Sequence, residues 1–228
     1  MENKNKGKIG FRINHDFERL DKDILERFKK AGTCALSDGL NKFNAMHHAI
    51  KPIDEMLAVA GCALTVKMRP GDNLMLHKAI AMAKPGDVIV VDTCGCDSNC
   101  VMGDLMATAA MEQGISGLII DGGVRDILEL KQSKAPVFAK CVTPAVGDKD
   151  GPGEINGLIA CGGVAVAPGD IIVGDANGVI VVPKGQWEAV LEGAEAKLEK
   201  DRARMAEILS GVIAKKAIDD TLAKSGVI

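Results

Sequence analysis

Two continuous apolar runs with an amphipathic segment between them dominate the middle of the chain. The runs are Asp87–Asp92 and Gly117–Asp121, and each ends in a carboxylate, as expected for strands that are buried on both faces. The segment Leu105–Gln113 is rich in Ala, Leu and Met, which predicts a helix that ends at Gly114. Strand, helix and strand form a βαβ unit, so the two strands should be parallel neighbours.

The flanking pattern predicts further strands and terminal helices. The strands are Ala58–Arg69, Pro136–Val142, Val164–Ala167, Ile171–Val173 and Val179–Val182, with a hairpin turn at Asn177-Gly178 and a glycine-rich loop between 147 and 163. The helices are Asp16–Lys30 ending at Gly32, a second one from Thr33 or Ser37, a short one at Leu74–Ala83, a long one from about 185 to 209, and a last one after Gly211. The fold class is therefore α/β, a mixed sandwich around a central βαβ unit.

Length and composition favour one domain. No Pro/Ser-rich linker or charge block divides the 228 residues, so we expect a single domain over 1–228, with N-terminal helices at about 16–45 and a C-terminal helical arm at about 185–228. A net charge of -3, no Tyr and one Trp argue against nucleic-acid binding. With no signal-peptide core at the start and no apolar stretch of membrane length, we expect a cytoplasmic protein without membrane contact.

The candidate chemistry lies on the turns that follow the two buried strands. Gly103-Asp104 opens the predicted helix, and twenty residues separate Asp104 from Arg125-Asp126, in the predicted turn 122–126. Both turns should meet beyond the carboxyl ends of their strands, where open α/β sheets bind ligands. Arg125 can fork onto a carboxylate, Asp126 is an oxygen ligand suited to Mg²⁺, and the helix start at Asp104 favours anions. These parts suit a small anionic oxo acid.

A purely structural role is the alternative for the same residues. Asp104 could be a first-turn charge, and Arg125-Asp126 could be an ion pair at a helix start. The cysteines likewise have a simple interpretation. Cys94, Cys96 and Cys100 crowd into the loop before Gly103, but the spacing C-x-C-x3-C is not a standard metal-ligand spacing, so small loop and core residues are favoured over a zinc or redox site. The other cysteines, scattered in apolar or glycine-rich context, are Cys34, Cys62, Cys141 and Cys161.

Several motifs together resemble one known family. They are Gly103-Asp104-Leu105, Asp121–Asp126, Cys161–Val164, Pro168-Gly169-Asp170 and Asp175–Val179. From about Ser37 to the C-terminal helix, the chain is similar to the family that joins the 4-hydroxy-4-methyl-2-oxoglutarate aldolases to the regulator of ribonuclease activity A. The resemblance implies a swivelling-domain-like β/β/α sandwich with C-terminal helices, assembled as trimers or hexamers with sites at subunit interfaces.

The resemblance also implies an activity and residue roles. The aldolase branch uses a divalent metal to cleave 4-hydroxy-2-oxo dicarboxylic acids to pyruvate, and its members commonly decarboxylate oxaloacetate. Asp126 would hold Mg²⁺ or Mn²⁺ largely through water, Arg125 would bind the substrate and steady the enolate, and Asp104 would orient metal-bound water. The substrate carboxylate would be gripped by the amides of Gly103, Asp104, Leu105 and Met106. An acidic residue from a neighbouring subunit's C-terminal helix, Glu199 or Asp201, would complete the set.

Three alternatives remain open. The ribonuclease-regulator branch would make the chain a non-catalytic binding module, although Asp104 and Asp126 together favour an enzyme. A Schiff-base aldolase would need a buried lysine, for which Lys67 or Lys140 are candidates. The C-terminal helix is explained most simply as a solvated charged face.

Two features leave the pocket incompletely defined. His47, His48 and His77 have no carboxylate partner at helical spacing and are assigned to the surface or to the surroundings of the site. The cysteine loop departs from the family pattern, so the pocket for the far end of the substrate stays undefined.

Overall fold

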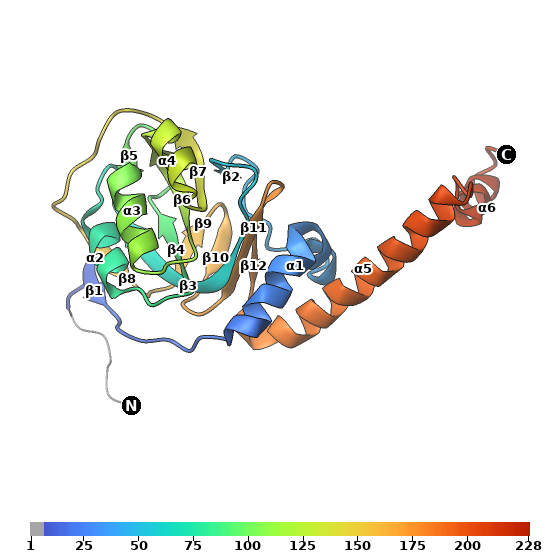
Figure 1. Cartoon of the computed structure of the whole chain (residues 1–228), viewed down its shortest axis with the longest axis horizontal. Coiled ribbons are helices and arrows are strands. Elements are labelled where there is room, and N and C mark those ends of the chain that lie inside the picture. The colour runs from blue at the N-terminus through green and yellow to red at the C-terminus, as the bar shows by residue number, and fades with distance from the viewer. Residues whose placement is uncertain (1–6) are drawn as a thin grey trace.

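The computed structural model describes residues 7–228, and a mixed sheet of ten strands forms its centre (Figure 1). The strands are β1 (Phe11–Ile13), β2 (Lys51–Pro52), β3 (Val59–Met68), β4 (Asp87–Asp92), β5 (Cys100–Met102), β6 (Gly117–Val124), β7 (Val137–Val142), β8 (Gly153–Ile155), β11 (Ile171–Asp175) and β12 (Gly178–Val182). The main order is β1-β8-β3-β4-β6-β7-β2; β11 joins β3 and carries β12, and β5 pairs with β6. A separate hairpin consists of β9 (Ile159–Cys161) and β10 (Val164–Val166).

Helices cover this sheet in two groups. The helical segments are α1 (Lys22–Gly39), α2 (Leu74–Met82), α3 (Asp104–Glu112), α4 (Ile127–Ser133), the 3-10 turn η1 (Lys184–Gln186), α5 (Trp187–Leu209) and α6 (Lys216–Lys224). Helices α2, α3 and α4 bury their apolar side chains against one face of β3, β4, β6 and β7. The other face of these strands packs on β9 to β12, and α1 and α5 cover the outer side of β11 and β12. The chain is thus a mixed α/β fold in layers.

The predicted βαβ unit is present. β4 and β6 are adjacent and parallel, with Asp92 opposite Asp121. In β4, Ile89 and Val91 face the core under the helices. The alternate residues Val88 and Val90 face the inner strands, so the run is buried on both faces. Helix α3 ends where the backbone of Gly114 becomes left-handed, as a C-terminal glycine should.

Some boundaries predicted from the pattern were wrong. The first helix begins at Lys22 rather than near Asp16, whereas the predicted break at Gly32 is present, since the backbone there is non-helical and separates two helical halves. β6 continues to Val124, so Gly122–Val124 belong to the strand and the turn begins at Arg125. The pattern also missed β1, β2, β5, β8, β9 and α4. Most of these strands have only two or three residues, too few to show a period, and they exist because distant strands supply their hydrogen bonds.

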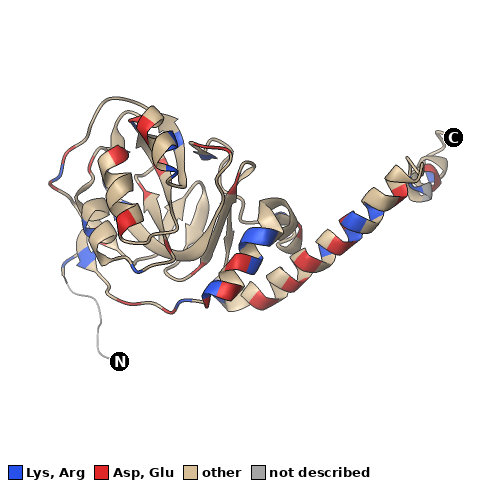
Figure 2. Ribbon diagram, in the orientation of Figure 1, with Lys and Arg blue, Asp and Glu red and all other residues tan. Residues whose placement is uncertain are grey.

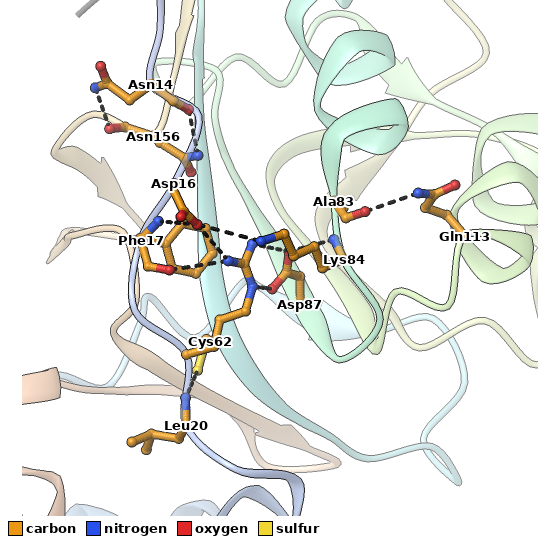
Figure 3. Close-up of polar contacts among 11 residues, drawn as sticks. Asn14, Asp16, Phe17, Leu20, Cys62, Ala83, Lys84, Asp87, Gln113 and Asn156 are labelled. Atoms are coloured by element: carbon orange, nitrogen blue, oxygen red, sulfur yellow. Dashed lines mark hydrogen bonds and ion pairs between the residues drawn. The ribbon is translucent and has the colours of Figure 1, made fainter. Parts of the chain in front are cut away.

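Several polar contacts hold the segment before α1 against the body of the chain, and the most buried of them is the ion pair between Arg19 and Asp87 (Figure 3). Arg19 donates from Nε to one carboxylate oxygen of Asp87 at 2.7 Å and from Nη2 to the other at 2.9 Å. The Asp87 side chain is 1% exposed and also accepts the backbone N–H of Lys84. The hydrogen bond to Asp87 is the main reason that the pKa of Arg19 lies above its ordinary value. This bidentate contact explains why the segment is extended here rather than helical.

The C-terminal arm leaves the body of the chain (Figure 1). α5 buries only Val190, Leu191 and Ala194, near its start, and no described side chain between 200 and 228 is buried. Acidic residues prevail in the first half of α5, and acidic and basic residues are mixed in its second half (Figure 2). Large apolar side chains are nevertheless exposed on the arm, namely Met205, Ile208, Leu209, Val212, Ile213, Ile218, Leu222, Val227 and Ile228. No helix among the described residues is long and apolar enough to cross a membrane.

Replacing Arg19 by Ala should destabilise the fold, because it leaves the buried Asp87 carboxylate without its cation. We expect the free energy of unfolding to fall by roughly 2 to 3 kcal/mol, somewhat less than for a fully buried pair because Arg19 is partly exposed. The matched control is Arg27→Ala, which removes an exposed pair with Glu195 and should lower the free energy of unfolding much less than Arg19→Ala. Urea unfolding measures the free energy of unfolding of both variants. An equal decrease in the two variants would contradict the role assigned to Arg19.

Candidate active site

A cleft of about 140 Å³ opens where β5 leads into α3 and β6 leads into α4. All six residues predicted from the βαβ unit and the family resemblance line it: Gly103, Asp104, Leu105, Met106, Arg125 and Asp126. His77, which the sequence analysis assigned to the surface or to the surroundings of the site, and Cys100 of the cysteine loop also line it. Residues that the sequence did not single out complete the lining: Asn73, Val101, Met102, Val146 and Lys149. The parallel pairing of β5 with β6 brings the two turns together at one edge of the sheet.

The two turns touch at Gly103. The backbone N–H of Asp104 donates to Oδ2 of Asp126 at 3.3 Å, and the N–H of Arg125 donates to the carbonyl of Met102 at 3.1 Å. A Cβ atom on Gly103 would lie 2.2 Å from Oδ2 of Asp126, well inside van der Waals contact. Only glycine therefore lets the Asp126 carboxylate reach the start of α3.

Asp126 occupies an unusual position at the start of α4. Its backbone is left-handed, with φ 59° and ψ 47°, and its side chain forms no capping hydrogen bond to the helix that it precedes. Strained backbone of this kind concentrates at functional sites. Nε of Arg125 lies 3.3 Å from Oδ2 of Asp126, so the ion pair of the structural alternative is present. The carboxylate is nevertheless turned toward α3 and the cleft rather than toward its own helix.

The start of α3 presents unpaired amides to the cleft. The first backbone hydrogen bond of the helix runs from Ala107 to Gly103, so the N–H groups of Leu105 and Met106 have no partner within the helix. Gly103 precedes the helix and has no side chain to cap it. Outward-pointing amides at a helix start bind anions, carboxylates included. This part of the cleft suits the carboxylate of a small acid.

Helix α2 and the segment 143–151 supply the cleft residues that pattern reasoning missed. Asn73 is 4% exposed, donates from Nδ2 to the carbonyl of Val101 at 3.0 Å, and has no hydrogen-bond partner for Oδ1. The pKa of His77 lies below its ordinary value, mainly because of burial and secondly because of the positive charge of Lys149. The Pro70-Gly71-Asp72 turn marked the start of α2, but no local pattern places that helix beside residue 149.

The cysteine loop contributes little to the cleft. Cys100 lines it and is buried, which raises the pKa of its thiol. Cys94 and Cys96 lie in the preceding loop, outside the cleft lining. Among the described residues, no group of three or more His, Cys, Asp or Glu side chains is arranged to hold a metal ion.

The lysines proposed for a Schiff base are poorly placed. Nζ of Lys140 donates to the carbonyl of Gly95 at 2.9 Å and lies 3.7 Å from Asp121, so its amine is engaged as a cation. Lys67 is exposed, whereas a Schiff-base lysine is expected in a buried, apolar pocket.

The two acidic residues considered for a neighbouring site lie on the arm. In this chain Glu199 pairs with Arg202 and Asp201 pairs with Lys197, and neither lines the cleft. The rings of His47 and His48 stack on each other with their centroids 4.2 Å apart, and both residues lie outside the cleft lining.

The donors in the cleft fit a magnesium-type ion better than a zinc-type ion. Asp104 and Asp126 offer carboxylate oxygens, and only one of the Asp126 oxygens is engaged, by the Asp104 amide and Arg125. Mg²⁺ is commonly held by one or two carboxylates, with water and substrate filling the remaining positions. The carboxylates present here therefore suit Mg²⁺ or Mn²⁺, whereas a zinc site would need three or four protein ligands.

The chain is similar to known proteins along most of its length. Residues 33–181 match the family described as RraA-like, Aldolase/RraA. A protein of Halalkalibacterium halodurans named "Putative 4-hydroxy-4-methyl-2-oxoglutarate aldolase" is 43% identical over 195 residues, covering 86% of this chain and 93% of that protein.

Two solved structures share the fold. An uncharacterised protein from Pseudomonas syringae has a TM-score of 0.76 and 26% identity, covering 86% of this chain and 96% of that chain. The RNA-processing inhibitor RraA from Thermus thermophilus has a TM-score of 0.62 and 29% identity, covering 67% of this chain and 92% of that chain. The large mixed sheet is thus shared with RraA structures.

Replacing Gly103 by Ala should force the Asp126 carboxylate away from the start of α3, because the new Cβ would overlap Oδ2. We expect a loss of roughly 1 to 3 kcal/mol in the free energy of unfolding, the usual cost of overpacking. Gly185→Ala is the control, since nothing lies within 4 Å of its added Cβ, and it should change stability by less than about 0.5 kcal/mol. Urea unfolding measures the free energy of unfolding of both variants. A Gly103→Ala protein as stable as the wild type would contradict the close approach of Asp126 Oδ2 to residue 103.

The imidazole of His77 should titrate below the ordinary histidine pKa and be neutral at pH 7. Lys149→Met removes the smaller of the two causes, so the pKa of His77 should rise without regaining its ordinary value, since burial remains. Lys78→Met, on the same helix, should leave it unchanged. NMR titration of the ring protons measures all three proteins. A His77 pKa that is the same in wild type and Lys149→Met would show that the amine does not act on the imidazole.

Proposed function

The chain belongs to the RraA-like family of aldolases and ribonuclease regulators, and from that premise we propose that it is a divalent-metal-dependent aldolase. Its substrates would be 4-hydroxy-2-oxo dicarboxylic acids such as 4-hydroxy-4-methyl-2-oxoglutarate, cleaved to pyruvate and a second oxo acid. Decarboxylation of oxaloacetate would be a side activity. The observation that carries the proposal is the single cleft in which Arg125 and Asp126 meet the free amides at the start of α3.

The residues on the two turns of the cleft share the work of the proposed cleavage between substrate binding and proton transfer. The amides of Leu105 and Met106 bind the carboxylate next to the oxo group, beside Gly103 and Asp104. Asp104 orients a water that accepts the proton of the 4-hydroxyl group. The bond between C3 and C4 then breaks, and its electron pair moves into the enolate of pyruvate.

Arg125 acts on the charge that develops during this step. Its guanidinium lies in the cleft and donates to the enolate oxygen, which stabilises the negative charge until C3 takes the proton that the water oriented by Asp104 accepted from the 4-hydroxyl group. Oxaloacetate gives the same enolate when CO2 leaves from C3, so one site serves both reactions.

Asp126 would hold Mg²⁺ or Mn²⁺, largely through water. When bound, the ion supplies Lewis-acid stabilisation of the oxo group and of the enolate charge. Glu199 or Asp201 of a neighbouring copy would complete the site, in a trimer or hexamer joined partly by the arm. The fold would accordingly be of the swivelling β/β/α type, with 1–228 as one domain.

A regulator of ribonuclease activity is the second candidate. It is favoured by the structural likeness to the RNA-processing inhibitor RraA of Thermus thermophilus. Such a regulator would need no metal and no Arg125. Inhibition of an endoribonuclease that is undiminished by Arg125→Ala, in a protein that turns over no oxo acid, would favour this candidate over the aldolase.

The protein should release pyruvate from 4-hydroxy-4-methyl-2-oxoglutarate and from oxaloacetate. This release should stop when a chelator is added and resume when Mg²⁺ or Mn²⁺ is supplied. Asp126→Ala should lower turnover at least about 100-fold, since it removes the proposed metal contact. Arg125→Lys should lower it about 100- to 1000-fold, because an ammonium cannot reproduce the guanidinium fork. A lactate dehydrogenase-coupled assay measures the pyruvate.

Glu129→Ala is the matched control for these variants. Glu129 is an exposed acid in the first turn of α4 that does not line the cleft, so turnover should stay within about twofold of the wild type. Activity that survives the chelator and is trapped by borohydride would overturn the metal mechanism in favour of a Schiff base. Full activity in Asp126→Ala would show that another residue holds the metal.

A further inference from the structure

One wall of the cleft comes from segments that lie far apart in the sequence. Asn73 and His77 are at the start of α2, while Val146 and Lys149 belong to the segment between β7 and β8. Neither segment belongs to the βαβ unit that carries Asp104, Arg125 and Asp126. The residues of this wall are therefore separate from those of the proposed chemistry. Contacts between this wall and the substrate can discriminate one substrate from another.

The backbone on both sides of Lys149 is fixed to the start of α2 by a buried carboxylate. Oδ2 of Asp72 accepts the N–H groups of Asp150 at 2.8 Å and Gly151 at 2.7 Å, and the Asp72 side chain is fully buried. On the other side, Asp148 donates its N–H to the carbonyl of Gly71 at 2.7 Å and accepts the N–H of Asn73 at 2.9 Å. Lys149 thus stands between two anchored residues.

Close packing of the two segments excludes a looser arrangement. A Cβ atom on Gly147 would lie 2.0 Å from the carbonyl oxygen of Gly71, so the two backbones are in direct contact. Arg69 adds a hydrogen bond to the carbonyl of Gly151 and a 3.4 Å contact to Asp148. The wall is preformed, which lowers the entropic cost of binding a ligand there.

The charge on this wall is positive and unpaired. Within the described residues, no carboxylate lies within 4 Å of the Lys149 amine, whereas the neighbouring Asp148 faces Arg69. His77 is the adjacent ionisable group, and its pKa lies below its ordinary value, partly because of the charge of Lys149. A cation left unpaired in a ligand-binding cleft is suited to an anionic group on the ligand.

We propose that Lys149 determines specificity by binding the second carboxylate of the substrate, so that the cleft selects 4-hydroxy-2-oxo diacids over monoacids of the same length. This inference rests on the proposed function and names the substrate class of the same site. The amides of α3 hold the carboxylate next to the oxo group, and Lys149 holds the distal one. The cysteine loop, which adds only Cys100 to the lining, is not needed for this selection.

The test compares two substrates that differ only at the distal group, 4-hydroxy-2-oxoglutarate and 4-hydroxy-2-oxopentanoate. Lys149→Met should lower kcat/KM for the diacid by about 10- to 100-fold, the range of a charge-assisted hydrogen bond, and leave the monoacid within about twofold. Lys149→Arg should recover most of the loss. Lys78→Met, an exposed lysine of α2 outside the cleft lining, should alter neither substrate. Equal losses for both substrates, or no loss for the diacid, would overturn the proposal.

Equilibrium binding separates this inference from the proposed function. 2-Oxoglutarate and 2-oxopentanoate are unreactive analogues that differ by a carboxylate and a methyl group, and calorimetric titration in the presence of Mg²⁺ gives both affinities. The wild type should prefer 2-oxoglutarate, and Lys149→Met should lose that preference. If no oxo acid is turned over but the preference holds, the aldolase assignment fails and the carboxylate site stands. If the wild type shows no preference, the role of Lys149 is wrong whatever the turnover.

Discussion

The close approach of two turns at Gly103 is the constraint on which the rest of the site depends. The parallel pairing of β5 and β6 brings the turns to the same edge of the sheet, but only the missing side chain at residue 103 lets the Asp126 carboxylate reach the Asp104 amide. Asp126 adopts a left-handed backbone to do so and gives up capping its own helix. The strain is tolerated because β6 is buried on both faces and cannot shift. A rigid sheet thus holds a carboxylate and a guanidinium against a helix start.

The same rigidity extends to the ends of the strands that are remote from the cleft. There, Arg19 neutralises Asp87 at the start of β4 and fastens the segment that leads into α1. Asp72 has a similar role near the cleft, where its carboxylate accepts backbone N–H groups and so joins the start of α2 to the segment carrying Lys149. Both carboxylates are fully enclosed, and both satisfy backbone amides that no strand or helix would otherwise pair. Buried aspartates therefore position irregular segments, while the more accessible Asp104 and Asp126 line the cleft.

The sequence predicted the βαβ unit and the residues of its turns because those features are local. Continuous apolar runs such as Val88–Val91 specify strands buried on both faces, and adjacent parallel strands must align their carboxyl ends. The extended segment around Arg19 was missed because its helical pattern is overridden by a partner 68 residues away. Lys149 was missed for the same reason, since its place depends on the distant Asp72. Assignments that rest on a second chain, such as Glu199 or Asp201, stay predictions.

The C-terminal arm and the cleft are linked by the proposal that a neighbouring copy supplies an acidic residue. Within the described residues the cleft offers two carboxylates and no three-ligand metal cluster, while the arm exposes acidic residues and a series of large apolar side chains that its own body does not cover. Exposed apolar surface of this kind marks an interaction site. A second copy that accepted the arm would bury these side chains and gain an acidic residue near its cleft. Assembly and completion of the metal site would then be a single event, because the same helix serves both.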